Sequence, residues 1–360
     1  MKAFYIENFK NFKNLQINNL LRVNLIVGKN NVGKSTLLEA ISLYLSQGSS
    51  YQITKLLEHR GELGSRYEET DEERKDHFLS LFYGYKENYS RTNDIFLGVS
   101  PNDLSAVRLF QVYIKERIEK DSDGIERKTR MRLFEEDLQD TDNALDSGFF
   151  VSSSNPYIMT YGGLRKMITS RDSNMSFQFV DARVFDVDQN AILFDKISLS
   201  PDEDYVVEAL QIINPQIERI AFVTSGNRRE RYPIVTMKND SRRYRLSSMG
   251  DGINRILTII LSMLNCKNGV FLLDEFETGL HYSVQERLWE IVFLLSRKLN
   301  IQVFATSHSR DCIEGFAIQN TDKEGLLIRL ESRGNDEIIP MIYSDRDDIL
   351  FAIKKDIEIR

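Results

Sequence analysis

The sequence predicts an α/β fold built on a mainly parallel sheet, and two observations lead to this class. First, residues 21–27 form a short, mainly apolar run with β-branched side chains, and a loop rich in glycine and asparagine joins it to a segment with apolar residues at helical spacing. Second, the C-terminal third alternates between an expected helix at 252–264, a strand at 270–274, a helix at 284–299 and a strand at 301–306. Strands that alternate with helices are typical of parallel sheets with helices packed on their faces.

The remaining elements of the expected core lie at its two ends. Residues 3–7 and 15–18 alternate between apolar and polar side chains, and the polar segment 10–14 joins them, which indicates an N-terminal β-hairpin. A Ser-Pro pair precedes an expected helix at 202–213 and is typical of a helix start. A second hairpin is expected at 326–330 and 337–343, and a final helix at 345–357.

The middle of the chain has a less regular pattern and predicts an inserted α+β region. Residues 67–75 carry a run of charges that is typical of a solvated helix or loop. Two strands are expected at 95–99 and 106–118, an acidic and turn-rich segment at 133–148, and a serine-rich loop at 149–155. The sequence therefore predicts a core made of residues 1–45 and 181–360, interrupted by an insertion, or second lobe, at residues 46–180.

Composition places the chain among folded globular proteins. Of its 360 residues, 41% are hydrophobic and 28% are charged, a balance that is not typical of a disordered chain. The longest apolar stretch, residues 256–264, is shorter than the about 20 residues that cross a bilayer. The N-terminus also lacks the apolar segment of a signal peptide. We therefore expect a cytoplasmic protein with no membrane partner.

Cysteine usage and net charge narrow the function further. Cys266 and Cys312 have neither a metal-ligand spacing nor a set of partners, so two buried thiols in a reducing cytoplasm are the preferred interpretation. The net charge of −7 excludes a strongly basic nucleic-acid binder. Any nucleic-acid contact must come from a local patch or from a partner.

Residues 28–35 match the pattern G-x-x-x-x-G-K-[ST] of a phosphate-binding loop. Glycines let the backbone fold around phosphates with its N–H groups inward, and the N-terminus of the following helix adds positive charge. Lys34 is expected to reach the β- and γ-phosphates of ATP, and the Ser35 hydroxyl to coordinate Mg²⁺. The alternative is an ordinary glycine-rich turn, which the position between an expected strand and an expected helix disfavours. The candidate nucleotide-binding residues are Gly28, Lys29, Asn30, Asn31, Val32, Gly33, Lys34, Ser35 and Thr36.

Two adjacent carboxylates, Asp274 and Glu275, stand at the C-terminal end of the expected strand 270–274. This is the end at which α/β sheets bind ligands. Because adjacent residues on a strand point to opposite faces, we expect the two acids to have different roles. Asp274 would hold Mg²⁺ through water, and Glu275 would orient the attacking water. A pair of solvated acids is the alternative, because acidic residues are mostly exposed.

His308 is the histidine that best suits a catalytic role. It follows the expected strand 301–306, and a histidine at this edge of the sheet can donate to the γ-phosphate or to the attacking water. His281 is a weaker candidate for a contact across a dimer interface, and His59 and His77 are expected at the surface. The expected catalytic residues are therefore Lys34, Glu275 and His308.

The order of these motifs resembles the core of ABC-type ATPases. The phosphate loop comes first, the segment Ser-Ser-Met-Gly-Asp-Gly at residues 247–252 opens a helix, and the two acids and His308 follow. The chain is most similar to the SMC-like and OLD-family branch, which includes AAA-type ATPases of bacterial anti-phage systems. The segment Phe-Lys-Asn-Phe at residues 9–12, the Asn-Asn pair in the phosphate loop and the run Asp-Glu-Phe-Glu-Thr-Gly-Leu-His at 274–281 carry this likeness. It covers residues 1–45 and about 180–360.

The resemblance implies a head-to-head dimer in which the signature loop of one subunit covers the γ-phosphate held by the other. Ser248 and Gly250 would make that contact, through the same helix-terminus anion binding now supplied by a second copy. The sequence departs from the Leu-Ser-Gly-Gly pattern of the family, because Met249 replaces a glycine. The implied cofactors are ATP and Mg²⁺.

The resemblance also raises the question of a nuclease. OLD-family proteins carry a Toprim nuclease domain after the ATPase. A typical domain has ~50–200 residues, and we expect the segment after His308 to be too short for one once its hairpin and final helix are set aside. We therefore expect a nuclease, if one takes part, to be a separate effector chain that the ATPase controls in defence against phage.

Two further functions compete with this interpretation. The alternative is an SMC-like repair or chromosome ATPase that grips DNA in its dimer, for which the basic clusters at residues 228–231 and 242–245 are the candidate contacts. Solvated loop residues are the more ordinary interpretation of such short charge runs. The chain has no long heptad array for an SMC-type arm. A subunit of an ABC transporter is disfavoured, because the insertion at 46–180 does not suit it.

Overall fold

The parallel sheet predicted from the sequence is present. The computed structural model describes residues 1–59, 70–120, 126–139, 145–166, 177–182, 187–224, 231–334 and 337–355. The chain divides into two compact units. Unit 1 comprises Met1–Asn19, Glu39–Met175 and Ser332–Ile339, and unit 2 comprises Leu20–Leu38, Ser176–Glu331 and Pro340–Arg360.

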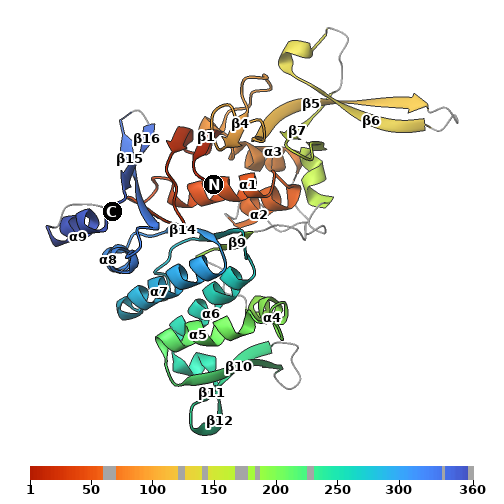
Figure 1. Ribbon diagram of the computed structural model, residues 1–360. Coiled ribbons are helices and arrows are strands. Elements are labelled where there is room, and N and C mark those ends of the chain that lie inside the picture. The colour runs from red at the N-terminus through yellow and green to blue at the C-terminus, as the bar shows by residue number, and fades with distance from the viewer. Residues whose placement is uncertain are drawn as a thin grey trace. The chain divides into compact units, whose positions relative to one another are not determined.

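Unit 2 is built on a sheet whose strand order is β16-β15-β3-β14-β13-β9 (Figure 1). Neighbouring strands from β9 to β15 are parallel. The strands are β3 (Val23–Val27), β9 (Phe177–Val180), β13 (Val270–Leu273), β14 (Gln302–Thr306), β15 (Gly325–Arg333) and β16 (Glu337–Tyr343). All five residues of β3 are buried, as expected of a strand covered on both faces. The mixed α/β class is therefore confirmed.

Helices alternate with the strands of this sheet, as the sequence pattern predicts. They are α1 (Lys34–Leu45), α6 (Asp251–Leu264), α7 (Tyr282–Lys298), α8 (Arg310–Gln319) and α9 (Arg346–Lys354). Trp289 on α7 is fully buried, stacks on Phe276 with ring centroids 4.0 Å apart, and donates its indole N–H to the Cys312 carbonyl. This contact fixes α7 and α8 against the segment that follows β13. Both cysteines are free and buried, as expected.

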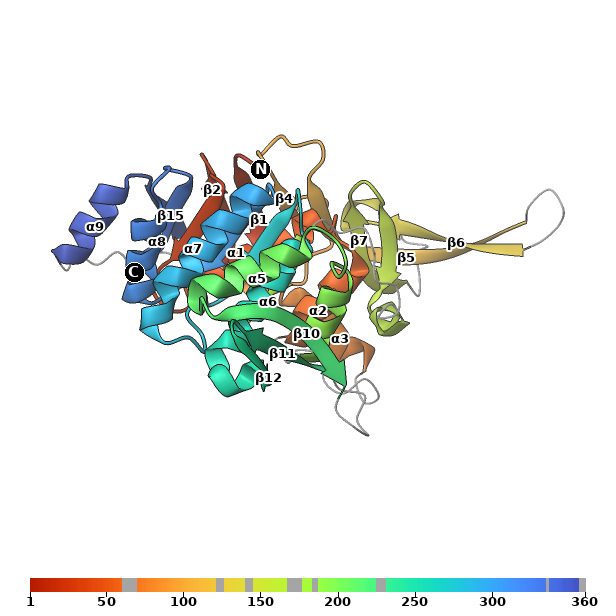
Figure 2. The ribbon, with the colours of Figure 1, turned by 60° about the horizontal axis from the view of Figure 1, so that its bottom comes forward.

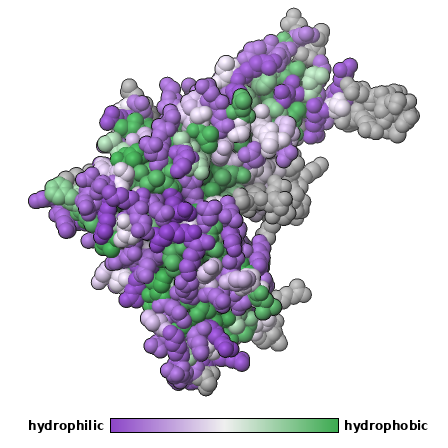
Figure 3. Space-filling view, viewed as in Figure 1, coloured by the Kyte–Doolittle hydropathy of each residue, from purple (hydrophilic) through white to green (hydrophobic). Residues whose placement is uncertain are grey.

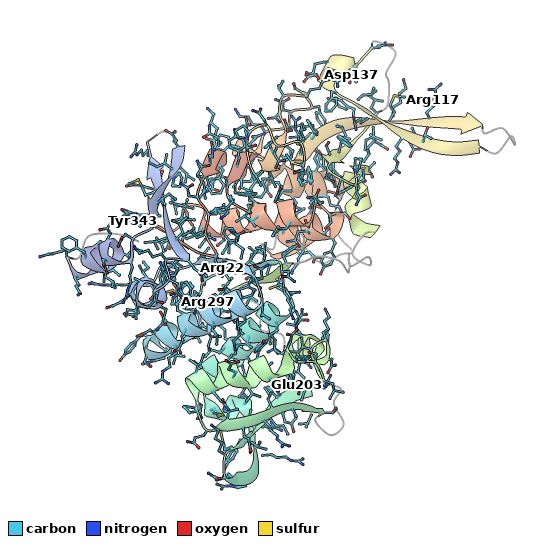
Figure 4. The ribbon with its side chains drawn as sticks, viewed as in Figure 1. Arg22, Arg117, Asp137, Glu203, Arg297 and Tyr343 are labelled. Carbon is cyan, nitrogen blue, oxygen red and sulfur yellow. The ribbon has the colours of Figure 1, made fainter. Side chains whose placement is uncertain are left out.

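Ion pairs that solvent reaches, half-buried at Arg22 and exposed at Arg297, lie at the N-terminal ends of strands in unit 2. Arg22, just before β3, donates to Glu324 over 3.1 Å, and Arg297 near the end of α7 donates to Asp322 over 2.8 Å (Figure 4). Such solvent-accessible pairs contribute little to stability, on the order of 0–1 kcal/mol each. The chemistry-bearing residues lie at the opposite, C-terminal ends of the strands.

A second sheet in unit 2 was not predicted from the sequence. It has the order β10-β11-β12 and consists of β10 (Ile217–Thr224), β11 (Arg231–Met237) and β12 (Asp240–Arg245). Helices α4 (Val187–Asp195) and α5 (Glu203–Ile213) pack against one face of it (Figure 2). On that face Phe222 contacts Phe194, and Arg231 donates to Asp195 over 2.5 and 2.9 Å.

Unit 1 contains an antiparallel sheet with the path β2-β1-β4-β5-β7-β8, and β6 pairs with β5. Its strands are β1 (Phe4–Phe9), β2 (Phe12–Ile17), β4 (Ile95–Gly98), β5 (Val107–Lys120), β6 (Glu126–Leu133), β7 (Asp146–Ser152) and β8 (Tyr157–Thr160). Its helices are α2 (Ser50–His59) and α3 (Asp71–Leu79), with short 3-10 turns at Tyr83–Tyr85, Glu135–Asp137 and Tyr161–Lys166.

Several expectations for this part of the chain are confirmed and one is wrong. The N-terminal hairpin and the strands near 95–99 and 106–118 are present. In the predicted loop at 149–155, residues 149–152 are instead the end of β7, because Phe149 and Val151 are fully buried between neighbouring strands; residues 153–155 lie outside the strand. Of the charge run at 67–75, residues 67–69 lie outside the described residues, and the rest begins α3, which Thr70 and Glu73 cap reciprocally.

The grouping of segments differs from the predicted one at the N-terminus. The sequence prediction assigns residues 1–45 to the core, whereas β1 pairs with β4 through Ile6 and Leu97 and so joins the sheet of unit 1. No helix in the described ranges is long and apolar enough to span a bilayer.

Candidate active site

The loop at residues 28–35 has the backbone geometry that its glycines predict. Gly28 has a φ of +144°, and a Cβ at this position would lie 2.5 Å from the carbonyl oxygen of Leu330 on β15. Gly33 has a φ of 99°, and Asn31 a φ of 64°. The first turn of α1 closes when the Leu37 N–H donates to the Gly33 carbonyl over 2.9 Å. The loop therefore turns sharply into a helix N-terminus, where free N–H groups favour an anion.

The Lys34 side chain folds back across this loop. Its Nζ donates to the carbonyl oxygens of Gly28 over 2.8 Å and Lys29 over 2.9 Å. Burial lowers the pKa of the ammonium group, while the carboxylates of Asp274, Glu277 and Glu275 act in the opposite direction. The ammonium group is thus held over the loop, within the field of the acidic residues.

Asp274 connects the loop with two strands of the sheet. Its Oδ1 accepts a hydrogen bond from the Ser35 hydroxyl over 3.0 Å and another from the Thr306 hydroxyl over 2.5 Å. The residue is 8% exposed. Burial raises the pKa of its carboxyl; the Thr306 and Ser35 hydroxyls lower it, and the charges of Asp181 and Glu275 raise it further. Sequence reasoning paired Ser35 with Asp274 but missed Thr306 and Asp181, which no local pattern marks.

The donor set of Ser35 and Asp274 fits Mg²⁺. Magnesium in such sites is held by one or two carboxylates together with water and substrate phosphates, rather than by a cage of protein ligands. In agreement, no group of three or more His, Cys, Asp or Glu side chains in the described ranges could hold a metal. Ser35 and Asp274 would hold the ion.

Glu275 is separated from Asp274 by its backbone rather than by strand alternation. β13 ends at Leu273, so both acids lie beyond the strand and the argument from alternating faces does not apply to them. Glu275 instead has a φ of 48°, an uncommon conformation for a residue with a side chain, which surrounding contacts must maintain. Its N–H donates to the Thr306 hydroxyl over 2.8 Å, and its Oε2 accepts from the Thr278 hydroxyl over 2.8 Å.

A buried arginine that sequence reasoning missed supports both acids. Arg255 on α6 is 1% exposed, and its Nη2 donates to the carbonyl oxygens of Asp274 over 3.1 Å and of Glu275 over 2.8 Å. The first turn of α6 also packs closely on the segment after Glu275, since a Cβ on Gly252 would lie 3.1 Å from the Gly279 carbonyl oxygen. The only sequence signal for this role is a cationic residue in an otherwise apolar helix.

His308 lies after β14 and is held by Glu277, another residue that sequence reasoning missed. The His308 ring Nδ1 lies 2.9 Å from Glu277 Oε1, and the His308 backbone N–H donates to the same oxygen over 2.8 Å. The imidazole is 57% exposed whereas the Glu277 side chain is 10% exposed. His281 instead caps α7, where its Nδ1 accepts from the Ser283 N–H.

Ser248 and Gly250 form a separate, exposed patch at the start of α6. A 3-10 turn, Leu246–Met249, precedes the helix, and the Ser248 hydroxyl donates to the Arg245 carbonyl over 2.7 Å. Gly250 has a φ of +109°, and no described heavy atom lies within 4 Å of the position that a Cβ would take. The space beside Gly250 is therefore open where a Cβ would stand, while its backbone N–H donates to the Ser247 carbonyl over 3.3 Å.

Known proteins that are similar to this chain in sequence include ATPases. A family model described as "AAA ATPase domain" matches residues 1–313. A protein of Helicobacter pylori described as an ATP/GTP phosphatase is 27% identical over 338 residues, which is 87% of this chain and 86% of that protein. A DNA replication and repair protein RecF of Clostridium acetobutylicum is 38% identical over 55 residues, 15% of each chain.

Among solved structures, an Smc head bound to the C-terminal winged-helix domain of ScpA is similar in fold. It aligns with a TM-score of 0.50 and 12% sequence identity, over 97% of this chain and 99% of that one. At this identity the likeness concerns the fold alone.

Proposed function

The chain belongs to the AAA ATPase domain family and is an ATPase, and from this premise we propose that Mg-ATP bound at residues 28–35 closes two copies of the chain on each other. The observation that carries the nucleotide site in this proposal is the 3.0 Å hydrogen bond between Ser35 and Asp274. It joins the phosphate loop to a carboxylate far away in sequence, at the edge where the strands end. Glu275 and His308 follow the ends of β13 and β14, which pair with each other in this sheet.

The loop at residues 28–35 binds ATP and neutralises the charge of its phosphates. Lys34 leaves the carbonyls of Gly28 and Lys29 and places its charge against the β- and γ-phosphates, which offer a more favourable partner for an ammonium group. The N–H groups at the start of α1 face the same phosphates. Ser35 and Asp274 would hold Mg²⁺, which would supply positive charge at the phosphate oxygens when bound.

Glu275 orients the attacking water. Its backbone is tied by Arg255 and Thr306 and its carboxylate by Thr278, so the remaining carboxylate oxygen has a fixed direction. Since a base must be placed before it can act, this restraint is the function of those contacts. His308 keeps its Nδ1 proton toward Glu277; its Nε2 then accepts from the water or, in the protonated ring, donates to the γ-phosphate.

The cover over the γ-phosphate comes from a second copy. Ser248 and Gly250 present an open, exposed helix N-terminus, which binds anions through its N–H groups and its dipole. This supports a dimer in which the patch of one protomer completes the site of its partner. We further propose that closure controls a separately encoded effector, a nuclease, in bacterial anti-phage defence.

The alternative is an SMC-like ATPase that grips DNA. The short match to a DNA replication and repair protein and a row of exposed arginines on β12 favour it. The two functions share the same ATP-driven closure and differ in what the closed dimer holds.

Solution mass with and without nucleotide tests the closure. We expect a Glu275→Gln protein to double its mass with Mg-ATP and to remain monomeric with ADP, as measured by light scattering. Adding Ser248→Arg should abolish the doubling while leaving ATP affinity unchanged, whereas Lys34→Ala should lose tight ATP binding. A Glu275→Gln protein that binds ATP tightly and stays monomeric would contradict the dimer.

Phage plating tests the defence role. Cells that carry the chain with its neighbouring genes should reduce plaque formation, and Lys34→Ala should remove the protection. Equal plating efficiency with and without the intact genes, across a panel of phages, would rule out the defence role and leave the ATPase mechanism standing.

A further inference from the structure

The outer face of the sheet β10-β11-β12 carries exposed arginines that the ATPase mechanism does not use. Cross-strand pairing places Arg219 and Arg243 on either side of Thr236, in one row across the three strands. Arg245 follows two residues after Arg243 and therefore lies on the same face, about 7 Å further along β12. All three arginines are exposed.

Burial shows that this face points outward. Val235 is 1% exposed and pairs with Tyr244, and both pack into the core of unit 2. Side chains alternate along a strand, so Arg243 and Arg245, which flank Tyr244, point away from that core. In the view of Figure 3, hydrophilic residues predominate at the end of the molecule where β12 lies.

The charge of these arginines is not neutralised within the described ranges. Arg219, Arg243 and Arg245 form no ion pair there, and the guanidinium of Arg245 instead lies 4.3 Å from the centre of the Tyr232 ring. Their neighbour Arg242 differs, because it lies on the opposite face and its guanidinium binds the Asp240 carboxylate over 2.8 Å. The outer face is therefore locally cationic on a chain whose net charge is −7.

We propose that this outer face binds the phosphate backbone of a nucleic acid strand through Arg219, Arg243 and Arg245. The arginines lie about 7 Å apart along a strand and about 10 Å apart across three strands. They can therefore contact a polymer whose charges repeat regularly, such as a nucleic acid backbone. An antiparallel sheet face that combines arginines with an aromatic ring is also a platform that single-stranded nucleic acids use.

An acidic protein fits this face less well. Protein interfaces depend on large apolar or aromatic anchors in desolvated pockets. Here the aromatic residue, Tyr232, is already covered on one side by Arg245, and the central side chain of the row is Thr236. The aliphatic residues of the face, Ile234 and Val223, are half-buried rather than fully exposed. This proposal rests on the DNA-gripping alternative above and names the surface that would bind the nucleic acid. It depends on neither the dimer nor the effector, so its failure would leave both untouched.

Fluorescence anisotropy with labelled oligonucleotides, single-stranded and duplex, tests the proposal over a series of salt concentrations. The double variant Arg243→Gln/Arg245→Gln should bind at least about tenfold more weakly than the unaltered protein. The slope of log K against log salt should fall by about 1.4 for a single strand or about 1.8 for a duplex, at ~0.7 and ~0.9 per lost phosphate contact. The arm with the larger loss identifies which form the face binds.

Arg242→Gln is the control, because it removes one of the guanidinium groups of the same strand, but from the opposite face. It should leave both affinity and slope unchanged, and ATP affinity should be the same in all three proteins. An equal loss in Arg242→Gln, competition by polyglutamate as strong as by the oligonucleotide, or no oligonucleotide binding at low salt would each overturn the proposal.

Discussion

The guanidinium of Arg255 lies 2.8 Å from the backbone carbonyl oxygen of Glu275, and the same nitrogen lies 3.1 Å from that of Asp274. Arg255 belongs to α6, the helix whose first residues follow Ser248 and Gly250. A single buried side chain therefore links the helix that carries the proposed contact with a second copy to the backbone of Asp274 and Glu275. A displacement of α6 on closure would be transmitted to the position of the Glu275 carboxylate.

Replacing Arg255 should lower turnover more than nucleotide binding. In Arg255→Met two buried carbonyl oxygens lose a charged donor, which costs about 1–3 kcal/mol for each unsatisfied group and leaves Glu275 without one of its restraints. We expect kcat to fall while KM and ATP affinity change little, and Arg255→Lys to restore part of kcat. Steady-state kinetics beside nucleotide binding separates these effects.

Arg287→Met provides the control for that experiment, since Arg287 also donates to a backbone carbonyl, that of Ile213, but on the exposed surface of α7. It should leave kcat unchanged. An Arg255→Met protein whose kcat and KM both match the unaltered protein would show that Thr306 and Thr278 alone position Glu275.

Glu275→Gln should retain ATP binding and lose hydrolysis. The amide has the shape of the carboxylate but cannot accept the proton of the attacking water, and removal of a positioned base costs on the order of 10²–10⁴-fold in rate. Phosphate release at saturating ATP measures the rate, and titration with a fluorescent ATP analogue measures the binding. Hydrolysis at the normal rate would mean that another group orients the water.

Removing the charge of Asp274 should stabilise the nucleotide-free protein at neutral pH. Burial raises the pKa of this carboxyl in the folded state. The folded protein therefore keeps the proton up to a higher pH than the unfolded chain does. As a result, stability falls as the pH rises through the interval between the two pKa values. Asp274→Asn avoids that loss. Its melting temperature without nucleotide should exceed that of the unaltered protein at pH 7, and the difference should shrink as the pH approaches the ordinary value of 3.8.

The same Asp274→Asn protein should gain no stability from Mg-ATP, because the substitution removes the carboxylate that would hold the ion. Scanning calorimetry with and without Mg-ATP follows both effects in one experiment. A lower melting temperature than that of the unaltered protein at pH 7, without nucleotide, would show that the two hydroxyl donors outweigh the burial of the charge.

The sequence predicts only part of this site, because only some of its residues belong to local sequence patterns. The loop at 28–35 and the pair Asp274 and Glu275 are local patterns, because backbone conformation and neighbouring residues make them functional. Arg255, Glu277 and Thr306 acquire their contacts only when the fold brings their elements together. Glu277 and Thr306 lie within or beside the recognised motifs, but the motifs do not show what these two residues contact.

The fold shows the same limit. The alternation of strands and helices predicts the parallel sheet of unit 2. The N-terminal hairpin, however, joins the sheet of unit 1 through a pairing between Ile6 and Leu97 that no local pattern predicts. The segment 149–155 contains three consecutive serines and was expected to be a loop. Burial of Phe149 and Val151 between two strands outweighs that composition.

Gly28→Ala should destabilise the protein even without nucleotide. The added methyl group would lie 2.5 Å from the Leu330 carbonyl oxygen and 2.9 Å from a methyl group of Val32, on a backbone with a φ of +144°. A strained conformation of this kind costs about 1–3 kcal/mol, and relief of the contact must move the loop away from β15. We expect a lower melting temperature together with weaker ATP binding, because the same shift disturbs the N–H groups that face the phosphates.

Gly334→Ala separates this effect from the general consequence of replacing a glycine. No described heavy atom lies within 4 Å of the Cβ position at Gly334, and its φ is outside the left-handed range, so its unfolding free energy should change by no more than about 0.5 kcal/mol. Equal melting temperatures for the two variants would mean that β15 yields to the methyl group at little cost. A selective loss in Gly28→Ala would instead show that close packing of the loop against β15 holds the phosphate site in shape before ATP arrives.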